Sequence, residues 1–348
     1  MPVDASSAPT PTKSGNPVLV FLQRHRESSV VLVLLVICVL LYFSSARTTF
    51  YSTANLQNLL LQIALLSVFA IGETIVILTG GIDLSLGSLI AFSGMVLAMA
   101  ATQLNTRMYT GSAVVLAIML TVVVVLAIGA LHATLIHRLR LPPFVVTLAS
   151  LTILRSQSLL MNKQLPVSLS DFPVLTYLAN GRLFEHSFFP LPVPVAIVGV
   201  IAIVVHLLLN YARIGRYVYS VGSNEQATRL SGVNVGRIKL FAYGLSALLG
   251  GVAGILYAGY GGQGDPLSGT GYELNAVAAA VIGGANLRGG QGSIAGTLLG
   301  ACLLNVILSG INLTIANPSL WEGTVVGGVL LLAVLTTALQ QRDKTKDT

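Results

Sequence analysis

The apolar run LQNLLLQIALLSVFAIGETIVIL, residues 56–78, decides the fold class of this chain. Glu73 is its only charged residue, and as an α-helix the run is long enough to cross a hydrocarbon core about 30 Å thick. Because lipid offers no water to the backbone, a spanning segment must satisfy its own peptide groups, and a helix does so. The run therefore predicts a transmembrane helix.

Further segments share this character, so the whole chain has the composition of a membrane protein. With 54% hydrophobic and 9% charged residues among 348, it has too little polar material to cover a water-soluble protein. We expect an all-α integral membrane protein with about ten transmembrane helices, the eighth too short for a full crossing and therefore broken. The helices are expected near residues 30–43, 56–78, 86–101, 112–136, 144–161, 193–209, 240–257, 274–282, 294–313 and 320–339.

One transmembrane domain, residues 29–339, is predicted between two polar ends. Residues 1–28 are rich in Pro, Ser and Thr and are expected to form a disordered cytoplasmic tail. Residues 340–348 are expected to form a second cytoplasmic tail. Ser44, Ser45 and Ala46 after the first apolar run resemble a signal-peptide cleavage site, but the long N-terminal tail favours a retained anchor.

The basic residues predict which way the chain crosses the membrane. With ten helices and a cytoplasmic N-terminus, fourteen of the 19 Lys and Arg residues lie on the cytoplasmic side, as the positive-inside rule favours. Both termini are then cytoplasmic, and the net charge of +7 reflects topology and not nucleic-acid binding. The cytoplasmic set is Lys13, Arg24, Arg26, Arg138, Arg140, Arg213, Arg216, Arg229, Arg237, Lys239, Arg288, Arg342, Lys344 and Lys346.

Glycine patterns predict how the helices meet. Three pairs have the small-xxx-small spacing that lets two helix backbones approach closely. In addition, GGIDLS at residues 80–85 follows the second segment and GGQGDPLS at 261–268 follows the seventh. An offset of five crossings reverses orientation, which predicts an inverted internal repeat; the alternative is that Gly and Asp recur in many membrane turns. The pairs are Gly250 and Gly254, Gly296 and Gly300, and Gly323 and Gly327.

Four polar residues inside or beside apolar runs are candidates for a solute pathway: Glu73, Asp83, Asn275 and Asn305. Burying such groups in a membrane is costly, so they tend to face the bundle interior or a water-filled route. For Glu73 the alternatives are a place in the pathway and a purely structural role. Asp83 lies just before the third segment and is expected to cap that helix.

The cytoplasmic connection 211–239 is long and basic, and its centre has the pattern of a short helix. Ser223 is a candidate N-cap with Gln226 at the third helical position, and Gly232 is a stop signal. Such a helix, tied at both ends to membrane segments, is suited to transmit a push from a cytoplasmic partner; the alternative is an ordinary surface helix. The residues expected to touch that partner are Ser223, Asn224, Glu225, Gln226, Arg229, Leu230 and Ser231.

Several motifs resemble the ribose/xylose/galactose-type permeases of bacterial ABC importers, within the branched-chain amino acid/ribose permease superfamily. They are GET at 72–74, TGGIDLSLGS at 79–88, VGSNEQA at 221–227, SGVNV at 231–235 and AVIGGANLRGGQGS at 280–293. The likeness extends from about residue 54 to the last apolar segment.

This resemblance implies a permease homodimer in the bacterial inner membrane. A cytoplasmic ABC ATP-binding subunit would engage the helix at 223–231, and a periplasmic sugar-binding protein would deliver a monosaccharide such as ribose. No cofactor is implied, and since the chain has no G-x-x-x-x-G-K-[ST] loop, ATP hydrolysis is expected on a separate chain and not on this transport subunit. The alternative is an ion-coupled secondary transporter in which Glu73 and Asp83 carry protons or sodium.

The largest external connection, residues 162–191, mixes aromatic and charged side chains. It is either a docking surface for the binding protein or an interfacial aromatic belt. His132 and His206 are isolated in apolar runs, so metal binding is not indicated. The aromatic residues of the connection are Phe172, Tyr177, Phe184, Phe188 and Phe189.

Overall fold

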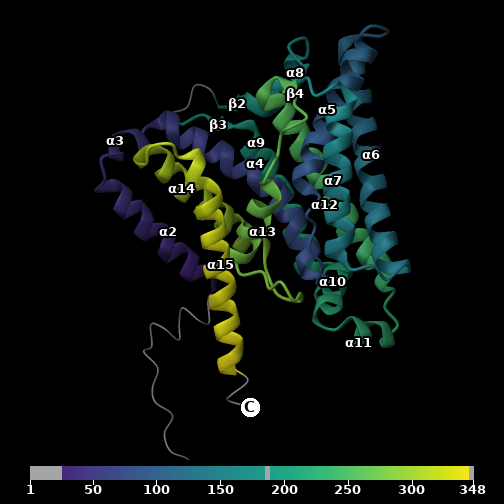
Figure 1. The fold of residues 1–348 in the computed structure, drawn as a ribbon, viewed down its shortest axis with the longest axis vertical. Coiled ribbons are helices and arrows are strands. Elements are labelled where there is room, and N and C mark those ends of the chain that lie inside the picture. The colour runs from purple at the N-terminus through teal and green to yellow at the C-terminus, as the bar shows by residue number, and fades with distance from the viewer. Residues whose placement is uncertain (1–25, 185–188, 345–348) are drawn as a thin grey trace, which may run out of the picture.

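The structure, a computed structural model, describes residues 26–184 and 189–344 (Figure 1). Ten of its helices coincide with the ten predicted segments. They are α2 (Arg26–Tyr42), α4 (Thr53–Leu78), α5 (Leu86–Asn105), α6 (Thr110–Arg138), α7 (Pro143–Met161), α9 (Val193–Tyr211), α12 (Val235–Gly261), α13 (Tyr272–Ile282), α14 (Ile294–Thr314) and α15 (Ser319–Lys344).

The all-α membrane fold is confirmed, whereas the number of crossings stays a prediction. Among the described residues, seven helices are long and apolar enough to span a membrane, namely α4, α5, α6, α7, α9, α12 and α14. The other three, α2, α13 and α15, carry shorter apolar stretches. The eleven-residue α13 is the segment predicted to be too short for a full crossing, and its centre, Ala276–Val281, is buried in the bundle.

Four short helices and four two-residue strands complete the described residues. The helices are α3 (Arg47–Phe50), α8 (Pro173–Asn180), α10 (Arg213–Ser223) and α11 (Glu225–Leu230). The strands β1 (Val167–Ser168) and β4 (Gln263–Gly264) pair antiparallel, as do β2 (Arg182–Leu183) and β3 (Leu191–Pro192). The sequence predicted a single helix in the connection 211–239, but the structure has two.

The predicted tails lie mostly outside the described residues. Of residues 1–28, only the last three are described, and they begin α2. At the other end, α15 continues to Lys344, beyond the predicted boundary at 339.

Helices α4 and α12 form the centre of the bundle (Figure 1). Every residue of α4 from Ala64 to Leu78 is buried, as expected of a helix that is apolar all round. Helix α12 packs against α4, α5 and α6, and α4 also packs against α13 and α14. The central pair therefore connects the N-terminal and C-terminal halves of the chain.

The contacts of the two halves follow one pattern. Helix α5 contacts α6 and α7, as α13 contacts α14 and α15. Across the halves, α4 contacts α13 and α14, as α12 contacts α5 and α6. This correspondence between α4–α7 and α12–α15 supports the predicted internal repeat.

Two of the three glycine pairs pack as predicted, and the third does not. A Cβ atom on Gly254 would overlap Ser93 Oγ of α5, and one on Gly300 would overlap the carbonyl oxygen of Ala279 in α13. In contrast, Gly323 and Gly327 have no atom of the described residues within 4 Å of an added Cβ. The prediction of close packing is therefore wrong for this last pair within the chain, because α15 turns that face away from its own bundle.

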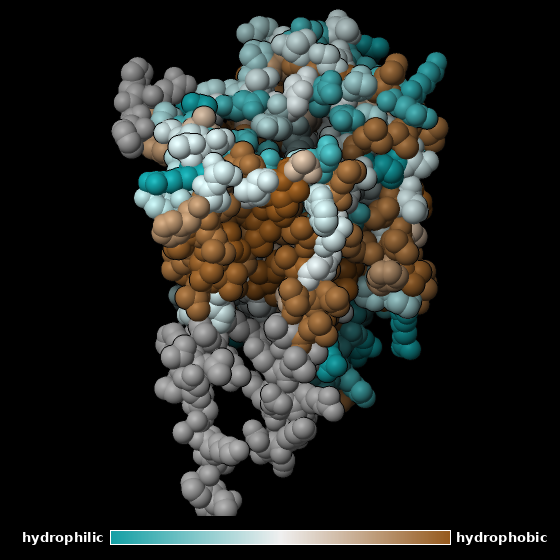
Figure 2. Space-filling model, turned by 60° about the vertical axis from the view of Figure 1, so that its left-hand side comes forward, coloured by the Kyte–Doolittle hydropathy of each residue, from teal (hydrophilic) through white to brown (hydrophobic). Residues whose placement is uncertain are grey.

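The surface has the hydropathy of a membrane protein. Figure 2 shows a broad hydrophobic band across one face, with hydrophilic residues above it. Large apolar side chains are exposed along the outer helices, including Leu40 on α2, Val123 on α6, Ile153 on α7 and Val200 on α9. Lipid tails can cover such residues without cost, so their exposure fits a bundle that lies within a bilayer.

The two ends of the bundle carry different elements. Figure 1 shows α10 and α11 at one end, and α8 and β4 at the opposite end. Helix α15 finishes at the α10–α11 end. At the other end, Arg155 of α7 donates hydrogen bonds to the carbonyl oxygens of Pro266 (2.9 Å), Ser268 (2.8 Å) and Gly87 (3.3 Å), and so holds the α12–α13 connection in place.

Candidate functional site

A polar cavity of about 440 Å³ opens among α4, α12, α13, α14 and α15. This volume is within the range of about 300–1,000 Å³ that is usual for small-molecule sites. Its wall combines amide, hydroxyl and aromatic side chains with one carboxylate. The lining residues are Asn55, Asn58, Leu59, Gln62, Leu66, Phe69, Tyr257, Tyr272, Asn275, Asn305, Leu308, Ser309, Ile311, Asn312, Leu313, Pro318 and Glu322.

Three aromatic rings from three different helices form one side of the cavity. Phe69 of α4 and Tyr272 of α13 stack with centroids 5.9 Å apart and planes 6° apart. The ring of Tyr257 in α12 lies 5.3 Å from that of Tyr272. Flat apolar ring faces of this kind suit the C–H faces of a small ring, while neighbouring polar groups can bind its hydroxyls.

Amide side chains supply most of the hydrogen-bonding capacity. The predicted pathway residues Asn275 and Asn305 both line the cavity. Asn305 Nδ2 donates a hydrogen bond to the carbonyl oxygen of Ala301 at 2.9 Å. This bond uses a donor of the amide and leaves its Oδ1 as an acceptor. An amide offers both donors and an acceptor, which matches a hydroxyl group that does both.

Asn55, Asn58 and Gln62 of α4 also line the cavity and were not predicted from the sequence. Polar residues are common near the ends of membrane helices, so none of these three amides indicates a site by itself. Their spacing was the available signal, because positions i, i+3 and i+7 lie on one face of a helix. Leu66 and Phe69 continue that face and also line the cavity.

The structure does not bring the other two predicted pathway residues, Glu73 and Asp83, to this cavity. Both are fully buried and lie beside each other in a separate polar cluster. The Asp83 backbone N–H donates to both carboxylate oxygens of Glu73 at 3.2 Å. Of the two alternatives for Glu73, this geometry favours the structural one, because its carboxylate holds the turn between α4 and α5.

Asp83 also binds in a way that the helix-cap prediction did not describe. Helix α5 begins after Ser85, two residues beyond Asp83. Asp83 Oδ1 accepts from the backbone N–H of Ser85 (3.1 Å) and from its Oγ (2.6 Å), and Oδ2 accepts from Ser246 Oγ of α12 at 3.1 Å. Asp83 therefore joins the start of α5 to α12, and it does not occupy the N-cap position.

At the opposite end of the bundle, α11 presents the residues predicted to contact a cytoplasmic partner. Gln226, Arg229, Leu230 and Ser231 are exposed, and Leu230 keeps 83% of its surface accessible. On the inner side, Thr228 is buried and its Oγ1 lies 2.9 Å from Ser220 Oγ of α10. The short helix is therefore anchored by one face and exposed on the other.

The N-cap prediction for this helix is wrong by one residue. Asn224, not Ser223, caps α11, since Asn224 Oδ1 accepts from the backbone N–H of Ala227 at 2.9 Å. Ser223 instead ends α10, where its Oγ donates to the carbonyl oxygen of Tyr219. The predicted stop is present, because Gly232 follows the helix with φ of +83°.

Two ion pairs hold α11 in place. Glu225 binds Arg229 within the helix and Lys239 of α12, both at 2.8 Å. Partial burial opposes ionisation, but hydrogen bonds and charge from Lys239 and Arg229 outweigh it and lower the pKa of Glu225. The carboxylate is therefore charged at neutral pH, and α11 is attached to the first turns of α12.

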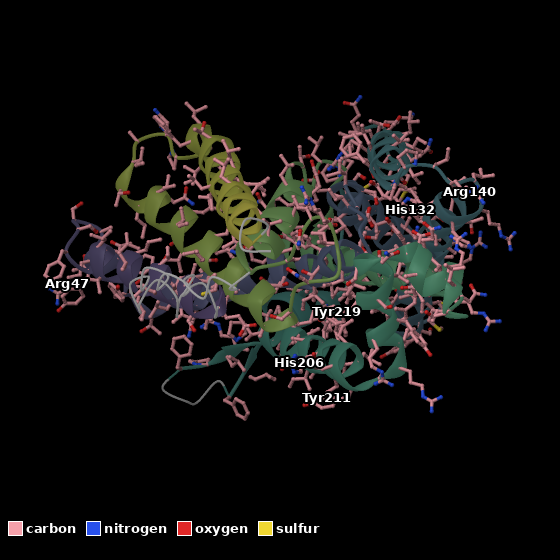
Figure 3. All side chains as sticks on the ribbon, turned by 90° about the horizontal axis from the view of Figure 1, so that it is seen from below. Arg47, His132, Arg140, His206, Tyr211 and Tyr219 are labelled. Carbon is pink, nitrogen blue, oxygen red and sulfur yellow. The ribbon has the colours of Figure 1, made fainter. Side chains whose placement is uncertain are left out.

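The two isolated histidines stay apart in the structure. Figure 3 shows His132 and His206 on different helices and far from one another. His132 Nε2 lies 2.7 Å from Ser150 Oγ, and His206 contacts Asn210. Each ring thus has a local structural partner.

The connection 162–191 is more structured than its composition suggested. Phe172 is buried at 1% exposure, with Leu175 of α8, in a cluster with Leu97 of α5. Tyr177 and Phe184 are exposed, whereas Phe188 lies outside the described residues. The aromatic set is therefore divided between packing and surface, so Phe172 is not available to a docking partner.

Comparison of the sequence with known proteins places this chain among transport proteins. A family model described as branched-chain amino acid transport system / permease component matches residues 55–335. No solved structure matches the chain.

Three curated relatives extend over most of the chain. The ribose import permease protein RbsC of Escherichia coli (strain K12) is 36% identical over 331 residues, which cover 94% of this chain and 98% of the relative. The inner membrane ABC transporter permease protein YjfF of the same organism is 34% identical over 84% of this chain and 86% of its own length. The D-allose transport system permease protein AlsC, also from that organism, is 30% identical over 86% and 88%.

Proposed function

Since this chain belongs to the family described as branched-chain amino acid transport system / permease component, we propose that it is the membrane-spanning permease subunit of an ATP-binding cassette importer for ribose or a similar monosaccharide. The observation that carries this proposal is the cavity formed by α4, α12, α13, α14 and α15. Its stacked rings and its amides are the groups that bind neutral sugars. The names of two relatives, which contain ribose and D-allose, support the same class of solute.

The two ends of the bundle support the assembly that we propose. A cytoplasmic ATP-binding subunit engages the exposed face of α11, and a periplasmic sugar-binding protein delivers the solute at the end that carries α8 and β4. The chain sits in the inner membrane with both termini in the cytoplasm, and two copies form the pathway. ATP is hydrolysed by the partner subunit, because the sequence contains no phosphate-binding G-x-x-x-x-G-K-[ST] loop.

An ion-coupled secondary transporter was the alternative function. It required Glu73 and Asp83 to carry protons or sodium along the solute route, yet neither residue lines the cavity. No observation on the described residues favours this alternative.

Uptake by the reconstituted importer tests the function. In membrane vesicles that contain the permease with its ATP-binding and sugar-binding partners, uptake is expected to stop without ATP and to persist when ion gradients are collapsed. The opposite result would support the secondary transporter.

A point variant tests the cavity. Asn275→Leu should reduce the uptake rate by about two- to tenfold, since a neutral hydrogen bond contributes about 0.5–1.5 kcal/mol. The matched control is Asn210→Leu, because Asn210 lies on α9, does not line the cavity, and within the described part of the chain is hydrogen-bonded through its side chain to His206. Equal uptake rates in the two variants would show that the cavity is not part of the solute route.

A further inference from the structure

The glycine-rich loop 283–292, between α13 and α14, lies where two other helices end. The backbone N–H of Gly290 donates to the carbonyl oxygen of Leu78, the last residue of α4, at 3.0 Å. Tyr219 Oη of α10 donates to the carbonyl oxygen of Gly292 at 3.0 Å. The loop is thus bonded on one side to α4 and on the other to α10.

Three backbones come into close contact at this point, and the Ser223 side chain of α10 lies against Gly290. A Cβ atom on Gly222 of α10 would overlap the carbonyl oxygen of Leu78 and lie 2.6 Å from the nitrogen of Gly290. A Cβ atom on Gly289 would lie 2.8 Å from the Gly222 carbonyl oxygen and 2.9 Å from the nitrogen of Gly80. We call Gly222, Gly289 and Gly290, with the Leu78 carbonyl, the glycine joint.

The backbone conformation in the loop also requires glycine. Gly289 has φ of +90° and Gly290 has φ of +73°, a region that L-residues with side chains rarely adopt. Gly222 has no such constraint and is glycine only because its neighbours are close. A substitution at Gly222 therefore changes the spacing in the joint without adding backbone strain.

The joint connects the exposed α11 to the cavity. Only Asn224 separates α10, which carries Gly222, from α11. On the other side, α4 runs from Leu78 back to Phe69, which lines the cavity, a distance of about 14 Å at 1.5 Å per residue. Tyr272 and Asn275 on α13, and Asn305 on α14, line the same cavity.

We propose that the glycine joint transmits movement of α11 to α4 and to the α13–α14 pair, and so opens and closes the cavity. This inference rests on the proposed function, because it assumes that an ATP-binding partner pushes on α11. Tightly packed backbones shift together as rigid bodies, and small displacements at such an interface become larger rearrangements elsewhere.

Tyr219 is a positioning residue of the joint. Burial raises the pKa of Tyr219, so its phenol keeps the proton that it donates to the loop. Figure 3 shows Tyr219 within the bundle and Tyr211 near its rim, and Tyr211 is 74% exposed. Tyr211→Phe is therefore a matched control for Tyr219→Phe.

The test measures sugar uptake and ATP hydrolysis together in the reconstituted importer, with the full permease and both partners. Gly222→Ala should lower the number of sugar molecules imported per ATP by about tenfold, because an added methyl in a closed contact forces the backbones apart. Tyr219→Phe should lower the same ratio by about two- to tenfold through one lost hydrogen bond. Tyr211→Phe and Gly199→Ala, whose added Cβ has no atom of the described residues within 4 Å, should keep the wild-type ratio.

Each outcome bears on one of the two proposals. If wild-type permease shows no ATP-dependent uptake, the proposed function fails. If wild-type permease imports sugar and Gly222→Ala or Tyr219→Phe keeps its ratio, the joint does not transmit movement and this inference is overturned. Should Gly222→Ala fail to assemble, the ratio for Tyr219→Phe alone decides.

Discussion

At the scale of single residues, replacing Gly254 or Gly244 of α12 by Ala should change the stability of the protein to different extents. In Gly254→Ala the new Cβ would overlap Ser93 Oγ and lie 2.6 Å from the Ile90 carbonyl oxygen, so we expect a loss of about 1–3 kcal/mol in stability. In Gly244→Ala the Cβ meets no atom of the described residues within 4 Å, and the better helix propensity of Ala should leave stability unchanged or raise it by up to about 1 kcal/mol.

Thermal unfolding of the purified permease in detergent measures both variants. The wild-type protein and Gly244→Ala should melt at similar temperatures, and Gly254→Ala should melt lower. Equal melting of the two variants would mean that α5 and α12 do not pack as closely as the structure has them.

Residue chemistry was only partly predictable from the sequence. Asn275 and Asn305 stood out because an amide inside an apolar run is unusual, and both line the cavity. Glu73 and Asp83 were predicted because a carboxylate inside or beside an apolar run is unusual, yet Glu73 accepts from the backbone N–H of Asp83 and Asp83 accepts from Ser246. Cost of burial identifies polar groups that need partners, but it does not tell whether the partner is a solute or the protein itself.

At the scale of elements, the ion pair between Glu225 and Lys239 attaches α11 to α12. The Lys239 side chain is 13% exposed and that of Glu225 39%, so water weakens the pair and it contributes about 1 kcal/mol or less. Glu225→Lys replaces attraction by repulsion and should lower the sugar imported per ATP by about two- to fivefold. Adding Lys239→Glu restores the attraction and should recover most of the ratio.

The same pair has a predictable pH dependence. The pKa of Glu225 is lower in the folded protein than in the unfolded chain, so its stabilising effect is complete above the unfolded value of about 4.3. The effect is lost only as the pH falls through the folded pKa. Wild-type coupling should therefore be equal at about pH 6 and pH 8, and a decline between these values would point to another group.

The sequence predicted long apolar helices well and short amphipathic ones poorly. All ten apolar segments form helices, because a peptide backbone surrounded by lipid must make its hydrogen bonds within its own segment. Helices α3, α8 and α10 were not predicted, because they are short and depend mainly on packing against other elements. For α8 this packing is the cluster around Phe172. The cap of α11 was misplaced since Ser223 and Asn224 are both good N-caps, and only the turn geometry selects Asn224.

At the scale of the whole molecule, the orientation in the membrane is the main prediction still to be measured. Leu230 of α11 is 83% exposed and Tyr109, just before α6, is 84% exposed. In a chain whose two cysteines, Cys38 and Cys302, are replaced by Ala, Tyr109→Cys should react with a membrane-impermeant maleimide in spheroplasts. Leu230→Cys should react only in inverted vesicles. Reversed labelling would place α11 outside and contradict its role as the partner site.

The arrangement of the helices was less accessible to sequence than their existence. The Gly-Asp segments after the second and seventh predicted segments indicated an internal repeat, and the matching contacts of α4–α7 and α12–α15 support it. The cavity needs five helices from both halves, and nothing local to any one of them specifies that they meet. Long-range packing of this kind has no short motif.

The first turn of α2 is hydrogen-bonded to the start of α14, and this bond affects where a label can be attached. Glu27 Oε1 accepts a hydrogen bond of 2.6 Å from Ser293 Oγ, and the same hydroxyl accepts the N–H of Gly296 at the start of α14. An affinity tag or fluorescent fusion placed immediately before α2 would crowd this hydroxyl, next to the loop of the glycine joint. Labels for purification or microscopy are better attached after α15.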